Sequence, residues 1–471
     1  MPVSDLGKAK KIKAQDEAKQ RERREDMAFL RSELENYNRV NLPMLLLVFA
    51  MLSYGLIMLF SASLSSAYAE WGDPMYYVKR QFFFTLIGLI LVFVMLRIPI
   101  RFFNRPVFTA AVYGAGTILL LLVRLKGVQG DYGAMRWLSL GPIQFQPSEL
   151  CKIAAIYVLA SYFPYVEKAQ RQGRWIEDDS RQQLITDGRL YIVYPAVAMG
   201  VWLVLILIQP HFSGAFILFL VTASIFWVAK IPGKVWLSGL AQLLPILLIL
   251  AILLFAIFPL LTKGQSFFDF LSKRFAHVFS RLNTFNNPEE ASEDSLHQVV
   301  QSRYALGSGG WTGKGLGMGQ QKSGFLPMVY NDFILPSIGE ELGFLGSVSI
   351  IALFVVFFLI GVSICTSCNS KFTVILSWGC TLLITLQALL NIAVAAEVIP
   401  PTGISLPFFS YGGSSQIFFL LAVGFILSCS KTGQKADKNL QYILLEQRSY
   451  DRSNAAKRPN SSEPRKTPLG Y

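Results

Sequence analysis

Long apolar stretches alternate with short polar ones along most of the chain. A run of about 20 apolar residues can cross the hydrocarbon core of a bilayer, and shorter runs can do so when neighbouring helices shield them. This alternation predicts an all-α polytopic membrane protein with about ten transmembrane helices. The predicted spans are Leu42–Leu64, Gln81–Leu96, Val107–Val123, Leu150–Val166, Leu190–Ile208, Phe212–Ala229, Val235–Leu261, Leu342–Cys365, Phe372–Val398 and Phe408–Cys429.

The composition agrees with a membrane protein. Of the 471 residues, 53% are hydrophobic and only 15% are charged, whereas a soluble domain carries about 25% charged residues. The net charge of +13 does not come from one basic face, because Lys and Arg gather in the tails and in alternate short loops. We therefore expect no nucleic-acid partner.

The distribution of Lys and Arg predicts the topology. These residues are concentrated before the first span, after the second and fourth spans, and after the last one. With ten spans, all these segments lie on one side, which the positive-inside rule assigns to the cytoplasm. We expect cytoplasmic tails at 1–41 and 431–471, both disordered, and a membrane domain at 42–430. Residues 262–341 then form a large extracytoplasmic loop between helices 7 and 8.

Polar side chains are densest at the start of the fourth predicted span. Ionisable groups at membrane depth are costly unless they are paired or wetted, so they are functional candidates. Glu149 and Lys152 are three residues apart, share a helix face and can pair. The alternative is a salt bridge that only holds the helix start, with Ser148 as the N-cap. The other polar residues of this segment are Arg136, Gln144 and Gln146.

Three further segments carry polar residues near predicted spans. The glycine-rich strip at 305–327 lacks the Walker pattern, but its backbone N–H groups with Lys314 and Lys322 could hold a pyrophosphate. A flexible loop is the alternative. Acidic residues at 332–341 open the eighth span, where the helix dipole favours negative charge. The prolines and glycines of 400–415 predict irregular backbone that is buried or lines a wet cavity.

These segments resemble signatures of the SEDS family of peptidoglycan polymerases, the FtsW, RodA and SpoVE type. The most specific ones read RW…QPSELCK, QSRYALGSGGWTGKGLGMGQQK, DFILPSIGEELG and TGISLPFFSYGGSS. The resemblance implies a ten-helix enzyme of the bacterial inner membrane that polymerises lipid II into glycan strands. It also implies a class B penicillin-binding protein and other elongation or division proteins as partners.

The chemistry that the resemblance implies is inverting glycosyl transfer with pyrophosphate as the leaving group. Such a reaction needs a base for the acceptor hydroxyl and cations near the phosphates. A divalent cation, Mg²⁺ or Mn²⁺, is possible, although no ligand spacing demands it. The candidate substrate-binding residues are Arg136, Glu149, Lys152, Lys314, Gln321, Lys322, Asp332, Ser410 and Gly412.

The chain departs from the family pattern where a catalytic aspartate is expected. In RLNTFNNPEEASEDSLHQ, at 281–298, that position holds Ala291. Glu290 or Asp294 is the expected replacement as catalytic carboxylate. Other signature positions also differ and hold His211, Met328 and Glu397. These departures leave open a catalytically degenerate scaffold or a lipid II flippase, and the sequence does not separate elongation, division and sporulation roles.

Overall fold

A computed structural model of the chain describes residues 40–129, 135–141, 143–209, 211–261, 293–322 and 329–432. Residues 40–430 form one compact unit. The predicted disordered tails lie almost entirely outside the described residues, and so does 262–292 of the predicted outer loop.

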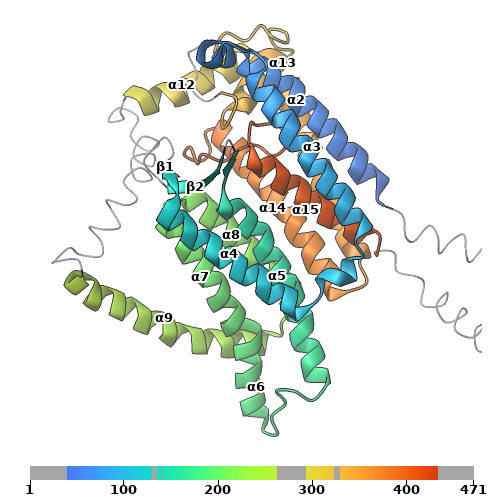
Figure 1. Cartoon of the computed structure of the whole chain (residues 1–471), viewed down its shortest axis with the longest axis vertical. Helices are drawn as coiled ribbons and strands as arrows, with labels where there is room; N and C mark the ends of the chain where they lie inside the picture. Colours follow the sequence, from blue (N-terminus) through green and yellow to red (C-terminus); the bar gives the residue numbers. More distant parts are fainter. Residues whose placement is uncertain are drawn as a thin grey trace, which may run out of the picture. The chain divides into compact units, whose positions relative to one another are not determined.

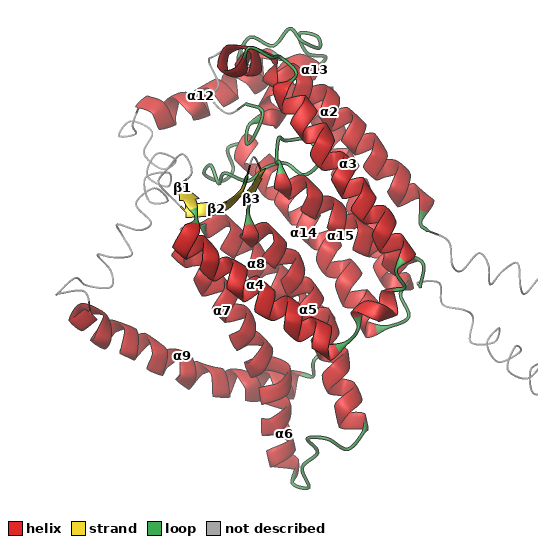
Figure 2. Cartoon of the chain, in the orientation of Figure 1, coloured by secondary structure: helices red, strands yellow, loops and turns green. Residues whose placement is uncertain are grey.

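The described unit is almost entirely helical (Figures 1 and 2). Eight helical segments in the described ranges are long and apolar enough to cross a membrane, and α8 and α15 are shorter apolar helices. An all-α polytopic membrane protein is thus confirmed, while the number of ten spans stays a prediction. The helices are α2 (Leu42–Trp71), α3 (Tyr76–Arg97), η1 (Ile100–Phe103), α4 (Pro106–Lys126), α5 (Pro147–Arg171), α6 (Ser180–Gly188), η2 (Arg189–Val193), α7 (Tyr194–Ile208), α8 (Phe212–Val228), α9 (Gly233–Leu261), α12 (Glu293–Ser308), α13 (Ile334–Ser367), α14 (Lys371–Ala395) and α15 (Ser414–Ser430).

Several predicted spans start at other residues than the observed helices; the second span, predicted from Gln81, begins at Tyr76 in α3. The last span begins at Ser414, not at Phe408, because the prolines and glycines before it keep the backbone irregular. Helix α13 begins at Ile334 and is interrupted at Gly343, directly after the predicted start of the eighth span at Leu342. Its first turns contain buried acidic residues, which the hydropathy pattern places outside the membrane helix.

A small antiparallel sheet, which the sequence did not predict, lies between α4 and α5. It consists of β1 (Val128–Gln129), β2 (Met135–Leu140) and β3 (Ile143–Phe145), in the order β1-β2-β3. Strands β2 and β3 form a hairpin in which Leu140 pairs with Ile143.

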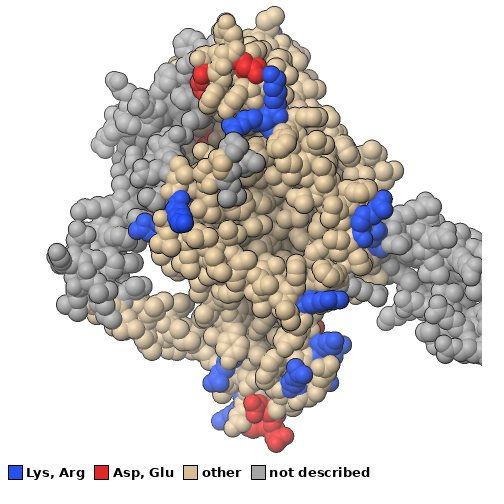
Figure 3. Space-filling model, viewed as in Figure 1, with Lys and Arg blue, Asp and Glu red and all other residues tan. Residues whose placement is uncertain are grey.

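Helix α5 lies at the centre of the bundle. It contacts α4, α8, α14 and α15, and 78% of its apolar window is buried, against 11% for α9. Helix α3 packs along α15, and α2 packs against α3 and α13 (Figure 1). Large apolar side chains are exposed on α3, α7, α9 and α13, and the middle of the surface in Figure 3 carries few charges. Such faces are suited to lipid contact.

Candidate active site

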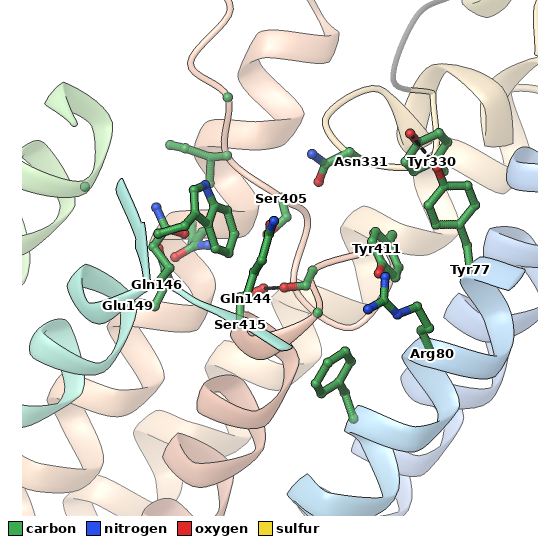
Figure 4. Close-up of a pocket in the computed structure, with 18 of the residues that line it drawn as sticks. Tyr77, Arg80, Gln144, Gln146, Glu149, Tyr330, Asn331, Ser405, Tyr411 and Ser415 are labelled. Carbon is green, nitrogen blue, oxygen red and sulfur yellow. Dashed lines mark hydrogen bonds between the residues drawn. The ribbon is translucent and has the colours of Figure 1, made fainter. Parts of the chain in front are cut away.

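A cavity of about 580 Å³ lies among the N-terminal ends of α3, α5, α8 and α15 (Figure 4). The sheet and the segments 330–331 and 403–413 complete its walls. In the predicted topology these four helices are the second, fourth, sixth and tenth spans, which all begin on the same side. The cavity therefore belongs to one end of the bundle, and its polar lining makes it the main candidate for a functional site.

The cavity contains the buried ion pair that the sequence predicted. Lys152 Nζ lies 2.8 Å from Glu149 Oε1, and the two side chains are 2% and 8% exposed. Lys152 Nζ also donates a hydrogen bond of 2.9 Å to Oε1 of Gln387 on α14. The pairing is confirmed, and the buried charges have the partners that such groups need.

Ser148 does not cap α5, which corrects the alternative interpretation of this segment. The helix begins at Pro147, and its N-cap residue, Gln146, makes no side-chain cap hydrogen bond. The Ser148 hydroxyl instead lies 3.0 Å from Nδ1 of His211, at the start of α8. A capping serine would precede the helix, whereas Ser148 lies within its first turn and points across to α8.

His211 is a buried part of the cavity wall. Burial lowers the pKa of its imidazole well below the usual value, and the positive charges of Arg136 and Lys152 lower it further. The imidazole is therefore neutral at neutral pH. Gly214 makes room for the ring, since a Cβ at that position would lie 2.6 Å from its atoms. A neutral imidazole can accept a proton, which is the property of a general base.

The opposite wall of the cavity is aromatic (Figure 4). The rings of Tyr77 and Tyr330 stack with centroids 4.2 Å apart, and Tyr411 meets Tyr77 edge-on at 4.9 Å. Arg80, one turn along α3 from Tyr77, lines the same wall and donates a 2.8 Å hydrogen bond to the hydroxyl of Tyr76. Apolar ring faces beside a guanidinium offer a surface for a sugar next to a phosphate.

The irregular segment before α15 is held by Gln81. Its side-chain amide donates to the Ser410 carbonyl at 3.2 Å and accepts from the Gly412 N–H at 3.3 Å. The Ser410 hydroxyl accepts a 2.9 Å hydrogen bond from Leu406 N–H, and Gly412 lines the cavity. The prediction of irregular backbone that lines a cavity is confirmed. Ser410 is buried and does not line the cavity, so in this structure its hydroxyl holds the conformation of the segment.

The described part of the glycine-rich strip lies against the start of α13, outside the cavity lining. Lys314 Nζ lies 2.7 Å from Glu340 Oε1, and Lys322 Nζ lies 2.5 Å from Glu341 Oε1. Both carboxylates are fully buried. They are within α13 and bind lysines, so the helix-capping account of Glu340 and Glu341 is wrong. The role of Lys314 and Lys322 as pyrophosphate ligands stays a prediction.

Glycines on both sides allow the strip and α13 to approach closely, since a Cβ on Gly309 or Gly313 would lie 1.9 Å or 2.1 Å from a carbonyl oxygen of α13. Gly343 interrupts α13 with φ 69° and ψ −164°, a conformation that side-chain-bearing residues rarely adopt. The N–H groups of Lys314 and Gly315 donate to the carbonyls of Glu340 and Glu341, and Phe344 N–H donates to the carbonyl of Gly310. The strip thus supplies hydrogen bonds where the helix is broken.

The remaining predicted residues lie in several places. Arg136, on β2, is close enough to His211 to lower its pKa, and the carbonyl of Asp332 accepts a 3.0 Å hydrogen bond from Asn391. Gln321 donates its backbone N–H to Glu340 Oε2 at 3.1 Å. Glu290 lies outside the described residues, and Asp294 falls in the first turn of α12. The catalytic role of these two carboxylates stays a prediction.

Within the described ranges, no three His, Cys, Asp or Glu side chains come together as a metal site. The residues that the structure places around the cavity include one carboxylate, Glu149, and one imidazole, His211, and Lys152 already pairs with the carboxylate. A role for Mg²⁺ or Mn²⁺ therefore stays a prediction.

Sequence reasoning missed the aromatic wall, Arg80 and Gln81, and treated His211 only as a departure from a signature. Tyr77, Arg80 and Gln81 precede or open the second predicted span, where aromatic and basic residues are common interface anchors. The signal in the sequence that could have found them is the set of Tyr77, Arg80 and Gln81, whose spacings of three and four residues put their polar groups on one helix face.

The chain is similar in sequence to a known family. Residues 42–435 match the family FTSW_RODA_SPOVE, described as "Cell cycle protein". A "Probable peptidoglycan glycosyltransferase FtsW" of Trichlorobacter lovleyi is 34% identical over 392 residues, which cover 83% of this chain and 93% of the relative. One of the same description from Geobacter sp. strain M18 is 32% identical over 401 residues, 84% of this chain and 97% of the relative.

Solved structures share the fold. A chain described under "Structural coordination of polymerization and crosslinking by a peptidoglycan synthase complex" superimposes with a TM-score of 0.59 at 23% identity, over 84% of this chain and 99% of that one. The rod shape determining protein RodA of Thermus thermophilus gives a TM-score of 0.53 at 22% identity, over 84% and 98%. At these identities the likeness concerns the arrangement of the helices.

Proposed function

The chain belongs to the FtsW/RodA/SpoVE family of cell cycle proteins, and from this premise we propose that it is a peptidoglycan glycosyltransferase that polymerises lipid II. Relatives that match more than 80% of the chain are described as peptidoglycan glycosyltransferases. The observation that carries the proposal is the cavity, in which the buried Glu149–Lys152 pair faces an aromatic wall with Arg80.

The reaction places defined demands on this cavity. The acceptor hydroxyl oxygen forms a bond to C1 of the donor sugar, and the bond between C1 and the pyrophosphate oxygen breaks. The pyrophosphate departs with the electron pair, and the hydroxyl proton passes to a base. The site must therefore hold two sugars, stabilise the developing charge on the phosphate and supply one proton acceptor.

Lys152 and Arg80 are the cations that line the cavity, and Arg136 lies close to His211. We assign the leaving pyrophosphate to these three groups. Lys152 can serve in this way because Glu149 and Gln387 fix its position, so that the cation needs no reorganisation as charge develops. Lys314 and Lys322 are held by Glu340 and Glu341 instead.

Two sources of the base are in competition. A carboxylate from the outer segment, Glu290 or Asp294, would replace the aspartate that is absent at Ala291. His211 is the second source, since its buried imidazole is neutral and lies in the cavity wall. Substitution of each group separately distinguishes the two sources.

The proposed location is the bacterial inner membrane, with 42–430 as the membrane domain and both termini cytoplasmic. The segments rich in Lys and Arg at 97–105 and 168–189 follow the C-terminal halves of α3 and α5, and the cavity lies at the opposite ends of these helices. The positive-inside rule then places the cavity on the outer side, where lipid II is polymerised. The proposed partner is a class B penicillin-binding protein, as the description of the similar synthase complex suggests.

Ala291 favours a second candidate function. A scaffold that has lost its base would keep the fold and the partner contact, and would need none of the carboxylates near Ala291. It would polymerise no lipid II, whereas the proposed enzyme does.

The deciding experiment is lipid II polymerisation by the purified full chain with its penicillin-binding partner, read on gels that resolve glycan strands. We expect wild-type polymer and a loss of at least tenfold in Lys152→Met, and we expect one of His211→Asn, Glu290→Ala and Asp294→Ala to lose most of the activity. The matched control is Lys371→Met, which removes an ion pair with Glu167 at the other end of α5. An arm with EDTA tests for a divalent cation. No polymer from a folded wild-type complex would leave the scaffold as the better account.

A further inference from the structure

A second cavity, of about 400 Å³, lies at the C-terminal half of α5, far along the helix from the candidate active site. Its walls come from α5, the loop that follows it, α6 and the start of α7. The segment that joins the two predicted spans here, 167–189, carries many charged residues. In Figure 3, Lys and Arg gather with acidic residues at this lower end of the molecule. The cavity therefore lies where a headgroup layer would meet the bundle.

Two opposite charges line this cavity. Arg189 opens η2, and its Nε donates a 3.0 Å hydrogen bond to Gln242 on α9. Glu177 lies in the loop after α5, and its Oε1 accepts a 3.4 Å hydrogen bond from the hydroxyl of Thr186. Thr186 and Arg189 are three residues apart on one helical segment, so they share a face. Among the ion pairs of the described residues, none joins Arg189 to Glu177.

Aromatic side chains complete the cavity. Trp175 is 41% exposed and Tyr194 is 54% exposed, while the hydroxyl of Tyr162 donates to the carbonyl of Leu190 at 2.8 Å. Trp and Tyr rings at the boundary between bilayer and water are typical anchors at the level of lipid headgroups.

An apolar stripe runs from the cavity along α7. Its side chains, all exposed, recur at spacings of three and four residues and therefore follow one face of the helix. They are Tyr194, Val197, Val201, Val204 and Ile208, each at least 42% exposed. The stripe begins at a residue that lines the cavity.

We propose that this cavity binds the headgroup of a phosphatidylethanolamine molecule whose acyl chain lies along the α7 stripe. The phosphate binds the guanidinium of Arg189, and the primary ammonium donates hydrogen bonds to Glu177 and Thr186. Phosphatidylglycerol would lack the ammonium and bring its net negative charge near Glu177. A choline headgroup has no N–H to donate. The two opposite charges thus favour a zwitterion with a primary amine.

The test is lipid retention by the purified full chain in detergent, compared for phosphatidylethanolamine, phosphatidylcholine and phosphatidylglycerol of the same acyl chains. Native mass spectrometry counts the bound lipid, and thermal unfolding at equal mole fractions gives its stabilising effect. We expect the ethanolamine lipid to be retained most. Because a hydrogen bond to a charged group contributes about a factor of ten or more to affinity, Glu177→Gln and Arg189→Gln should each weaken its retention by about tenfold.

Matched controls lie in the same loop. Asp178 and Arg174 are exposed and do not line the cavity, so Asp178→Asn and Arg174→Gln should keep the wild-type preference. If Arg189→Gln does not fold, Glu177→Gln decides, because Glu177 is an exposed loop residue. Equal retention of the three lipids by the wild type, or an unchanged preference in the cavity variants, would overturn the proposal. This readout does not depend on polymerisation activity.

Discussion

The Ser148 hydroxyl oxygen lies 3.0 Å from Nδ1 of His211, and this contact joins the first turn of α5 to the start of α8. Both side chains are buried, and the charged groups on the same side of the cavity are Arg136, Lys152 and Glu149. The contact places an uncharged imidazole beside two cations. Protonation of His211 would add a third positive charge to this group, which is unfavourable, so the stability of the protein should depend on pH.

The protein should lose stability in mild acid through His211. Its pKa in the folded state is well below the usual value, whereas in the unfolded chain it is about 6.5. Between these two values the unfolded chain binds a proton that the folded chain does not, so stability falls as the pH drops below about 6.5, by up to about 1.4 kcal/mol per pH unit. His211→Asn should flatten this dependence in thermal unfolding between pH 7.5 and 5.

Two other histidines serve as controls for this measurement. His277→Asn and His297→Asn change the same residue type elsewhere in the chain and measure how much the other two histidines contribute to the slope. A wild-type slope in His211→Asn, or none in the wild type, would contradict the neutral buried imidazole.

Local contacts of the site were predictable from the sequence, and contacts between distant segments were not. Glu149 and Lys152 are three residues apart, so helix geometry alone predicts their pairing. Their third partner, Gln387, is 235 residues further along the chain. No spacing rule connects such positions. The aromatic wall also joins residues that are far apart in the sequence, Tyr77, Tyr330 and Tyr411, so it could not be predicted either.

The fold, too, was predictable where it depends on local sequence and not where it depends on contacts between distant segments. Apolar runs predicted the membrane helices, because hydrophobicity over 20 residues is a strong local signal. The first turns of α13 were missed, since Glu340 and Glu341 look like solvent-exposed residues in the sequence. They are buried only because Lys314 and Lys322 come from another segment to pair with them.

Removing one partner of the Glu149–Lys152 pair should be more harmful than removing the charges of both. Lys152→Met leaves the Glu149 carboxylate buried without its cation, which should cost about 3–5 kcal/mol. Glu149→Gln with Lys152→Met removes both charges and should recover part of that loss. Chemical or thermal unfolding of the two single variants and the double variant gives the coupling energy. Polymerisation should stay low in the double variant, because the cation is still missing.

The less buried Glu167–Lys371 pair is the comparison for this cycle. Its side chains are 33% and 24% exposed, so its coupling energy should be about 1 kcal/mol or less. Equal coupling energies for the two pairs would argue against a buried, desolvated pair in the cavity.

Lys322 should act on stability and not on substrate affinity. Lys322→Met leaves the fully buried Glu341 without its cation, so we expect a loss of about 3–5 kcal/mol in stability. Glu341 keeps its hydrogen bonds from Ser61 and from the Gly317 N–H, which should let part of the protein fold. The folded fraction should show an unchanged KM for lipid II. A KM raised tenfold at unchanged stability would instead support the predicted pyrophosphate contact.

The aromatic wall should contribute to substrate binding. Tyr411→Leu keeps an apolar side chain but removes the ring that meets Tyr77 edge-on. An aromatic contact contributes about 0.5–1.5 kcal/mol beyond buried area, so the KM for lipid II should rise by about two- to tenfold with little change in kcat. The control is Tyr113→Leu, which removes a ring stacked on Trp202 outside the cavity. If Tyr411→Leu and Tyr113→Leu raise the KM equally, the effect comes from general packing. If only kcat falls in Tyr411→Leu, the ring positions the reacting groups and does not hold a sugar.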